Sequence, residues 1–139
     1  MGFNDEVSRA VNRKAPSVTT EDTLLQAMQL MVNHGLTALL VKSGGEVSGV
    51  ITDTDLQSRM ETNNDLAGTR VLEIMTSCQL ITGQAAKFPC VQMDSGLNVQ
   101  TALSIMNKAG MRHLVIAGED DTPMAIVSNM DLFRLALES

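Results

Sequence analysis

The sequence predicts a mixed α/β fold in which one β-α-β-β-α unit occurs twice, and three observations carry this prediction. Two stretches, 49–56 and 125–132, each run from an apolar strand end into a hydroxyl residue, two spacers, an aspartate and a leucine. A helical pattern of apolar residues precedes each stretch at the same spacing. The 44% hydrophobic content is enough to build a core. A repeat of this kind determines the architecture before any single residue does.

The first copy opens with a short helical turn in residues 5–14, where Val7 and Val11 are four residues apart. Residues 16–18 follow as an extended segment that begins at a proline. A helix then begins at Leu24, with Thr23 and Gln26 spaced as a capping box and Gly35 placed at its C-terminal end. Its core stripe has the i, i+3, i+4, i+7 spacing of Leu24, Ala27, Met28 and Met31.

Two strands, a turn and a second helix complete this copy. We expect a buried strand over 36–41, a turn over 43–46 and a strand over 47–52. A helix begins at Asp53, where acidic residues suit the positive end of the helix dipole. The polar segment 61–68 is predicted to be a linker.

The second copy has the same order. It has a short helix over 71–75 and a longer helix that ends at Gly110 and carries Val99, Ala102, Leu103 and Met106. Strands over 112–117 and 125–128, joined by a turn over 118–123, and a closing helix follow. Ala27 and Ala102 are 75 residues apart, and Asp55 and Asp131 are 76 apart. We therefore assign the repeats to residues 5–60 and 69–138, with a loop over 77–88 that has no counterpart in the first copy.

Composition and charge exclude several classes of function. The 16 acidic and 10 basic residues give a net charge of −6, whereas nucleic-acid binding relies on a basic face. Three Phe and no Trp or Tyr leave little for bases to stack on. No apolar run approaches the length of a membrane span, which is about 18 residues, and no signal peptide is evident. We expect a cytoplasmic protein with no nucleic-acid partner and no membrane insertion.

The pattern Ala-x-x-x-Met-x-x-x-Gly, followed by a hairpin and Thr/Ser-x-x-Asp, occurs twice in register and resembles the CBS domain, named after cystathionine β-synthase. Two such domains in tandem look like a Bateman module. The resemblance implies two repeats packed about a pseudo-twofold axis, with two clefts that bind AMP, ADP, ATP or S-adenosylmethionine as a regulatory ligand. It also implies a homodimer, no obligatory cofactor, and a fused or associated effector domain.

The resemblance also implies a set of binding residues. Thr52 and Asp55 match the first ribose motif, and Ser128 and Asp131 match the second. The segments 18–20 and 91–93 match the extended segments whose backbone contacts adenine, and two basic residues match a family position for phosphate contacts. The residues of these further positions are Val18, Thr20, Val91, Met93, Arg112 and His113.

The residues themselves allow two interpretations of the paired motifs. An aspartate at a helix start can accept two hydrogen bonds from a vicinal diol, and the N–H groups there can hold an anion. Alternatively, Thr52 with Asp55 and Ser128 with Asp131 are helix caps worth about 1 kcal/mol each. Duplication of the motif favours a ligand, and a non-binding homodimerisation scaffold is the alternative function.

Other candidate sites are weaker. Cys78 and Cys90 lie outside any C-x-x-C pattern, so we interpret them as inert thiols. The ten methionines fall mostly on helix faces and are interpreted as core residues rather than metal ligands. No nucleotide-binding P-loop, zinc-protease or hydrolase motif is present, and no nucleophile has an adjacent base. We therefore expect a protein that is not an enzyme and holds no metal.

Overall fold

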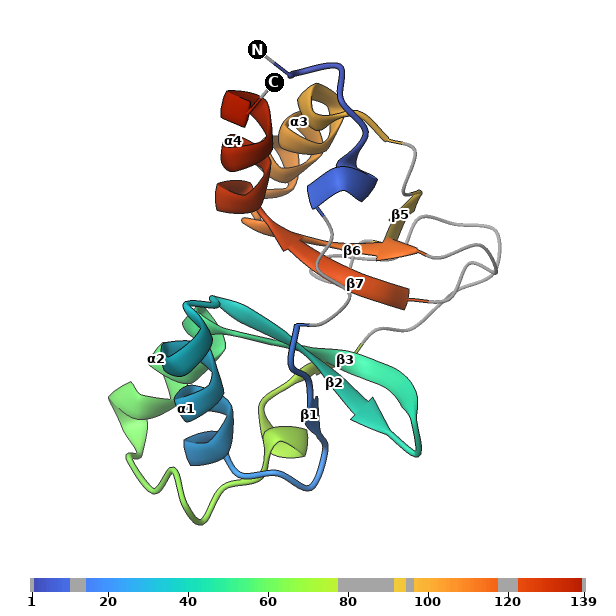
Figure 1. Ribbon diagram of the computed structural model, residues 1–139. Coiled ribbons are helices and arrows are strands. Elements are labelled where there is room, and N and C mark those ends of the chain that lie inside the picture. Colours follow the sequence, from blue (N-terminus) through green and yellow to red (C-terminus); the bar gives the residue numbers. More distant parts are fainter. Residues whose placement is uncertain (1, 11–14, 78–91, 95–96, 118–122, 139) are drawn as a thin grey trace. The chain divides into compact units, whose positions relative to one another are not determined.

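A computed structural model describes residues 2–10, 15–77, 92–94, 97–117 and 123–138 (Figure 1). Contacts within the chain divide it into two compact units. We call Pro16–Leu80 the first unit, and Met1–Ala15 together with Ile81–Ser139 the second unit. Residues 78–88 of the loop predicted over 77–88, both cysteines and most of the turn over 118–123 lie outside the described residues.

The first unit contains a four-stranded sheet with two helices on one of its faces (Figure 1). The strand order is β1-β2-β3-β4, where β1 runs parallel to β2 and the other neighbours are antiparallel. Its elements are β1 (Val18–Thr19), α1 (Leu24–His34), β2 (Ala38–Ser43), β3 (Glu46–Thr52), α2 (Asp53–Thr62), the 3-10 helix η2 (Val71–Glu73) and β4 (Thr76–Ser77). Two residues of the predicted linker, Glu61 and Thr62, thus belong to α2.

The second unit repeats this plan with a three-stranded sheet in the order β5-β6-β7. Here β5 is parallel to β6, and β6 is antiparallel to β7. Its elements are the 3-10 helix η1 (Val7–Ala10), β5 (Gln92–Asp94), α3 (Val99–Ala109), β6 (His113–Ala117), β7 (Pro123–Ser128) and α4 (Asn129–Glu138). The mixed α/β fold with a duplicated unit is therefore confirmed.

Helix α1 begins and ends where local chemistry predicts. The Thr23 hydroxyl accepts a hydrogen bond from the Gln26 N–H, and the Gln26 side chain accepts one from the Thr23 N–H, which confirms the capping box. Gly35 ends the helix with φ of +63°, in the left-handed region that a side chain would strain. Gly110 ends α3 in the same way with φ of +67°. The start of β2 at Ala38, two residues later than predicted, follows because the Leu36 N–H still donates to the Met31 carbonyl.

Each unit has its own apolar core between the helices and the sheet. The core of the first unit consists of Val18, Leu24, Ala27, Met31, Leu39, Val41, Ile51, Leu56 and Val71. The core of the second unit consists of Val7, Val99, Ala102, Met106, Leu114, Ile116, Val127, Leu132, Leu135 and Ala136. These residues include the predicted core stripes of both long helices, apart from Met28 and Leu103, which are partly buried.

Two short segments pack outside their own sequence repeat. Val7 lies in the leading segment of the first repeat, but it is fully buried in the core of the second unit, where its N–H donates to the Leu97 carbonyl at 2.7 Å. Val71 begins the second repeat, but it is fully buried in the first unit, and its N–H donates to the Asp22 carbonyl at 2.7 Å. The compact units therefore differ from the stretches 5–60 and 69–138, because each repeat's leading segment completes the core of the other repeat.

Candidate ligand-binding site

Thr52 and Asp55 form a reciprocal pair where β3 runs into α2. The Thr52 N–H donates to Asp55 Oδ2 at 2.9 Å, and the Asp55 N–H donates to Thr52 Oγ1 at 3.2 Å. This is a capping box, so the cap interpretation of the first motif is confirmed. The cap uses one carboxylate oxygen of Asp55. Within the part of the chain that the structure describes, no hydrogen bond reaches the other oxygen, Oδ1.

Ser128 and Asp131 form the same reciprocal pair where β7 runs into α4. The Ser128 N–H donates to Asp131 Oδ2 at 2.8 Å, and the Asp131 N–H donates to Ser128 Oγ at 3.1 Å. Here the second oxygen is engaged, because Arg134 Nη1 lies 3.3 Å from Asp131 Oδ1. That ion pair is exposed, with 65% of the Arg134 and 34% of the Asp131 side-chain surface accessible.

Burial raises the pKa of the Asp55 carboxyl above its ordinary value of 3.8. The hydrogen bonds from Thr52 oppose this shift, since they favour the charged form, and the negative charge of Asp53 adds to it. A carboxylate that is partly desolvated and has an oxygen available is suited to accept hydrogen bonds from a ligand hydroxyl.

The cross-strand register brings Arg112 and His113 to the second motif. His113 is the cross-strand partner of Ser128, and the Asn129 N–H donates to the Arg112 carbonyl at 2.9 Å. Four predicted site residues therefore gather at the start of α4. In the first unit the corresponding positions are Ala38, the partner of Thr52, and Thr37, whose carbonyl accepts from the Asp53 N–H at 2.9 Å.

The predicted adenine-contact residues lie elsewhere in each sheet. Val18 pairs with Val41, which in turn pairs with Gly49, three residues before Thr52. Its side chain is buried in the core, so only its backbone could face a ligand. Thr20 is also buried, and its N–H and carbonyl are bonded to the Lys42 carbonyl and the Leu72 N–H, both at 3.1 Å.

The register of β5 corrects the sequence matching of these segments. Met93 pairs with Ile116 in β6, and Val18 pairs with Val41 in β2. Because Val41 and Ile116 are 75 residues apart, Met93 is the counterpart of Val18, whereas the sequence matching gave that position to Val91. The second copy has extra residues relative to the first, and only the pairing of β5 with β6 shows that they lie before β5. Val91 itself lies outside the described residues.

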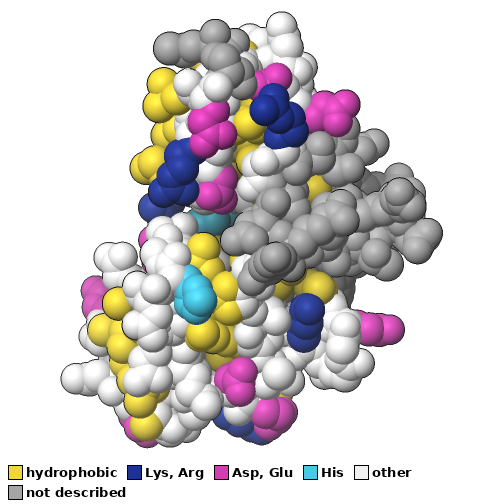
Figure 2. Space-filling view, in the orientation of Figure 1, with side chains coloured by type: hydrophobic (Ala, Val, Ile, Leu, Met, Phe, Trp, Pro, Cys, Tyr) yellow, Lys and Arg dark blue, Asp and Glu magenta, His cyan; other side chains and the backbone are white. Residues whose placement is uncertain are grey.

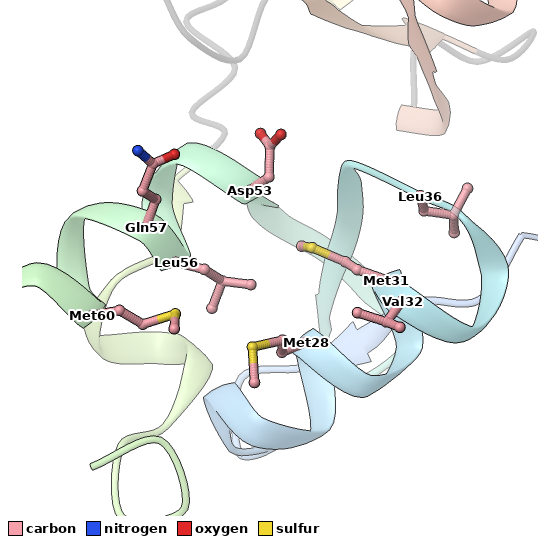
Figure 3. A pocket seen from close by; sticks show the side chains of 8 residues that line it. All are labelled: Met28, Met31, Val32, Leu36, Asp53, Leu56, Gln57 and Met60. Atoms are coloured by element: carbon pink, nitrogen blue, oxygen red, sulfur yellow. The ribbon is translucent and has the colours of Figure 1, made fainter. Parts of the chain in front are cut away.

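Each helix pair also encloses a hollow that the sequence did not reveal. The hollow between α1 and α2, which we call the methionine groove, has a volume of about 340 Å³ and is lined by Met28, Met31, Val32, Leu36, Asp53, Leu56, Gln57 and Met60. Figure 3 shows Met28, Met31, Leu56 and Met60 directed into the groove, while the Asp53 carboxylate and the Gln57 amide point away from it. The equivalent hollow between α3 and α4 has about 360 Å³ and is lined by Leu103, Met106, Asn107, Gly110, Met111, Arg112, Asn129 and Phe133.

Among the described residues, no three His, Cys, Asp or Glu side chains gather as a metal centre would require. None of the described helices combines the length and the apolar character needed to cross a membrane.

A duplicated α/β unit with a capped hydroxyl-x-x-Asp motif in each copy defines a tandem-repeat module of small sheets and paired helices. The chain belongs to the CBS domain family, because the CBS domain model matches residues 7–61 and 84–138. The predicted tandem CBS pair is therefore confirmed. CBS pairs are regulatory ligand-binding modules and are typically not catalytic.

Three similar proteins illustrate the family. The uncharacterized protein MJ1404 of Methanocaldococcus jannaschii is 25% identical over 94% of this chain, which spans 28% of that relative's length. The CBS domain pair of protein MJ0100, in complex with 5′-methylthioadenosine and S-adenosyl-L-methionine, has a TM-score of 0.72 at 17% identity and covers 96% of this chain and 97% of its own. The CBS domain of a bacterial CNNM/CorC family Mg²⁺ transporter, in complex with ATP, has a TM-score of 0.72 at 15% identity. That match covers 97% of this chain and 89% of the transporter domain's chain. At these identities the structural likeness shows the fold.

Proposed function

We propose that this chain is a regulatory module that binds an adenosine-containing ligand, AMP, ADP, ATP or S-adenosylmethionine, at its paired capping motifs. The observation that carries the proposal is the gathering of Ser128, Asp131, Arg112 and His113 at the start of α4. Two similar folds that bind adenosyl ligands, 5′-methylthioadenosine with S-adenosyl-L-methionine and ATP, support the choice of ligand class.

Both aspartates can bind a ribose without giving up the cap. Each holds its helix start through Oδ2, which leaves Oδ1 to accept from a diol hydroxyl. At Asp131 the ligand has to displace or share Arg134, and this is inexpensive because exposed ion pairs contribute about 0–1 kcal/mol. The cap and the ribose contact are therefore compatible roles of one side chain.

Phosphate groups favour the second motif. Arg112 and His113 lie beside Ser128 there, whereas the first motif has Thr37 and Ala38 at the same positions. The whole chain carries a net charge of −6, so a placed cation strongly affects where an anionic ligand binds. We propose that a nucleotide places its ribose at Asp131 and its phosphates toward Arg112.

A thermal-shift series with AMP, ADP, ATP, S-adenosylmethionine and NADH tests this function. At a ligand concentration of 100 Kd, mass action stabilises the folded chain by about 2.7 kcal/mol per site. For a chain of this size that is a rise of several degrees in Tm, at roughly 2–5 °C per kcal/mol. A flat response to every ligand would instead support the non-binding scaffold.

We also propose that the module is a cytoplasmic homodimer that regulates a fused or associated effector domain. Exposed apolar side chains on the helices support the dimer, since Val32 is 75% exposed and Leu137 is 73% exposed. Light scattering at micromolar concentration should report about twice the chain mass of 14.9 kDa. A monomer at that concentration would refute the dimer.

A further inference from the structure

The methionine groove collects three thioether groups from two helices. Met28 and Met31 lie three residues apart on α1, which makes them neighbours on one helix face, and Met60 lies on α2. All three line the groove, and Figure 3 shows their side chains directed into it from both helices. A methionine side chain has three rotatable bonds, so its sulfur atom can adjust to a guest. The three sulfur atoms can therefore converge on one small ligand.

The groove is accessible from solvent. Met60 is 43% exposed and Val32 at the rim is 75% exposed, whereas Met31 is only 6% exposed. Figure 2 shows hydrophobic side chains gathered on the surface of the helices of this unit. The thioethers therefore extend from the surface into the buried part of the groove, where Leu56 is also buried.

The donor atoms that face the groove are soft. Its remaining apolar lining consists of Val32, Leu36 and Leu56. The Asp53 carboxylate and the Gln57 amide, which are hard oxygen donors, point away from it (Figure 3). Thioether sulfur selects Cu(I), whereas carboxylate, carbonyl and water oxygens suit Mg²⁺, Ca²⁺ and Mn²⁺. An apolar shell also limits the access of solvent, which favours a singly charged ion over a doubly charged one.

The equivalent hollow of the second unit has a different lining. It contains two methionines, Met106 and Met111. Leu103 stands there at the position of Met28, at the same spacing of 75 residues that separates the two repeats. The set of three thioethers therefore belongs to the hollow of the first unit.

Charge also favours a cation in the first unit. Helices α1 and α2 carry three carboxylates, at positions 53, 55 and 61, and one guanidinium, at position 59, which gives a net charge of −2. The charges of α3 and α4 cancel, and Arg112 lines the hollow between them. The local field therefore attracts a cation to the methionine groove and repels it from the other hollow.

We propose that Met28, Met31 and Met60 form a thioether site for a soft monovalent metal ion, with Cu(I) as the biological ion and Ag(I) as its redox-inert analogue. This site is separate from the capping motifs. It departs from the sequence-based interpretation of the methionines as core residues, because at these three positions the groove makes the sulfur atoms accessible. Thioethers carry no proton to lose, so binding at this site should not depend on pH, unlike binding by thiols or imidazoles.

The test is a titration of the chain with Ag(I), followed by NMR of its methionine methyl groups. The signals of Met28, Met31 and Met60 should shift together and saturate at one ion per chain. The signal of Met130, which is 51% exposed on α4, should not move. Since thiols also bind Ag(I), the titration is repeated in the variant Cys78→Ser with Cys90→Ser, where the three shifts should persist unchanged between about pH 5 and 7.

Substitution of single ligands measures what each sulfur atom contributes. Met28→Leu copies Leu103 of the second unit, so it is compatible with the fold, and Met60→Leu changes a partly exposed position. Each should weaken Ag(I) binding by roughly 10-fold or more, since even the loss of an outer-shell partner typically costs a metal site 10- to 100-fold. Met130→Leu, which removes a thioether outside the groove, is the matched control and should leave the affinity unchanged. Anaerobic competition with a Cu(I) chelator should rank the same variants in the same order.

Three results would overturn the proposal. One is a set of shifts that follows the exposure of each methionine and does not saturate. Another is binding that disappears with the two cysteines. The third is an affinity that Met28→Leu and Met60→Leu leave unchanged. The NMR spectra also report whether each variant is folded, and because no nucleotide is present, none of these results depends on the proposed adenosyl ligand.

Discussion

Asp55 and Asp131 hold the same capping position in the two units but differ at their second carboxylate oxygen. Each accepts a backbone hydrogen bond through Oδ2, at 2.9 Å in Asp55 and 2.8 Å in Asp131. Oδ1 of Asp131 is paired with Arg134, whereas Oδ1 of Asp55 has no hydrogen bond among the described residues. The second unit thus offers a shared carboxylate beside basic residues. The first unit offers an available carboxylate without them.

The first prediction concerns which motif binds the nucleotide. Asp131→Ala and Arg112→Ala should each weaken AMP or ATP binding by roughly 10- to 100-fold, since a hydrogen bond to a charged group is worth about 1.5–3 kcal/mol. Calorimetric titration measures the affinity. Asp131→Asn is the control for folding, because the amide oxygen can keep the cap. Unchanged affinity in both alanine variants together with a loss in Asp55→Ala would assign the ligand to the first motif.

The second prediction concerns the cap at the start of α2. Thr52→Ala removes the hydroxyl that accepts from the Asp55 N–H, so the free energy of unfolding should fall by about 0.5–2 kcal/mol. Urea unfolding gives the value, and Thr52→Ser, which keeps a hydroxyl, should retain most of it. A loss of ligand affinity in Thr52→Ala without any loss of stability would mean that the hydroxyl serves the ligand alone.

The third prediction follows from the raised pKa of Asp55. Because the folded-state pKa lies above the ordinary 3.8, the folded chain binds this proton more readily than the unfolded chain. The charged carboxylate therefore lowers stability at neutral pH, and this penalty disappears as the pH falls through the raised pKa. Wild type should gain stability relative to Asp55→Asn between neutral pH and about pH 4. A carbon-detected NMR titration of the Asp55 carboxyl with a midpoint at or below 3.8 would contradict this.

The fourth prediction tests the placement of Val7 in the second unit. Val7→Ala removes two carbons from a fully buried side chain and should lower the free energy of unfolding of that unit by about 1.5–3 kcal/mol. Amide hydrogen exchange should show lost protection in α3, α4 and β6, with α1 unaffected. Val32→Ala, at a position that is 75% exposed, is the control. Loss of protection in α1 instead would assign the segment to the first unit.

Local features of this protein are readable from the sequence because they depend on residues a few positions apart. The capping pair of Thr23 and Gln26 and the left-handed Gly35 involve neighbours within one or two helical turns, and both are found as predicted. The duplicated α/β fold follows from such signals repeated 75 residues apart. The motif of Thr52 and Asp55 is recognisable for the same reason, since a hydroxyl three residues before a carboxylate at a helix start has only a few possible roles.

Long-range pairing decided what these local signals leave open. Only the strand register shows that Met93 corresponds to Val18 and that His113 lies beside Ser128. Only the packed cores show that Val7 and Val71 each complete the unit of the other repeat. A valine has the same apolar surface to bury in either core. Its burial site is therefore determined by which cavity the folded chain presents, a property of tertiary structure that no periodic pattern within its own segment encodes.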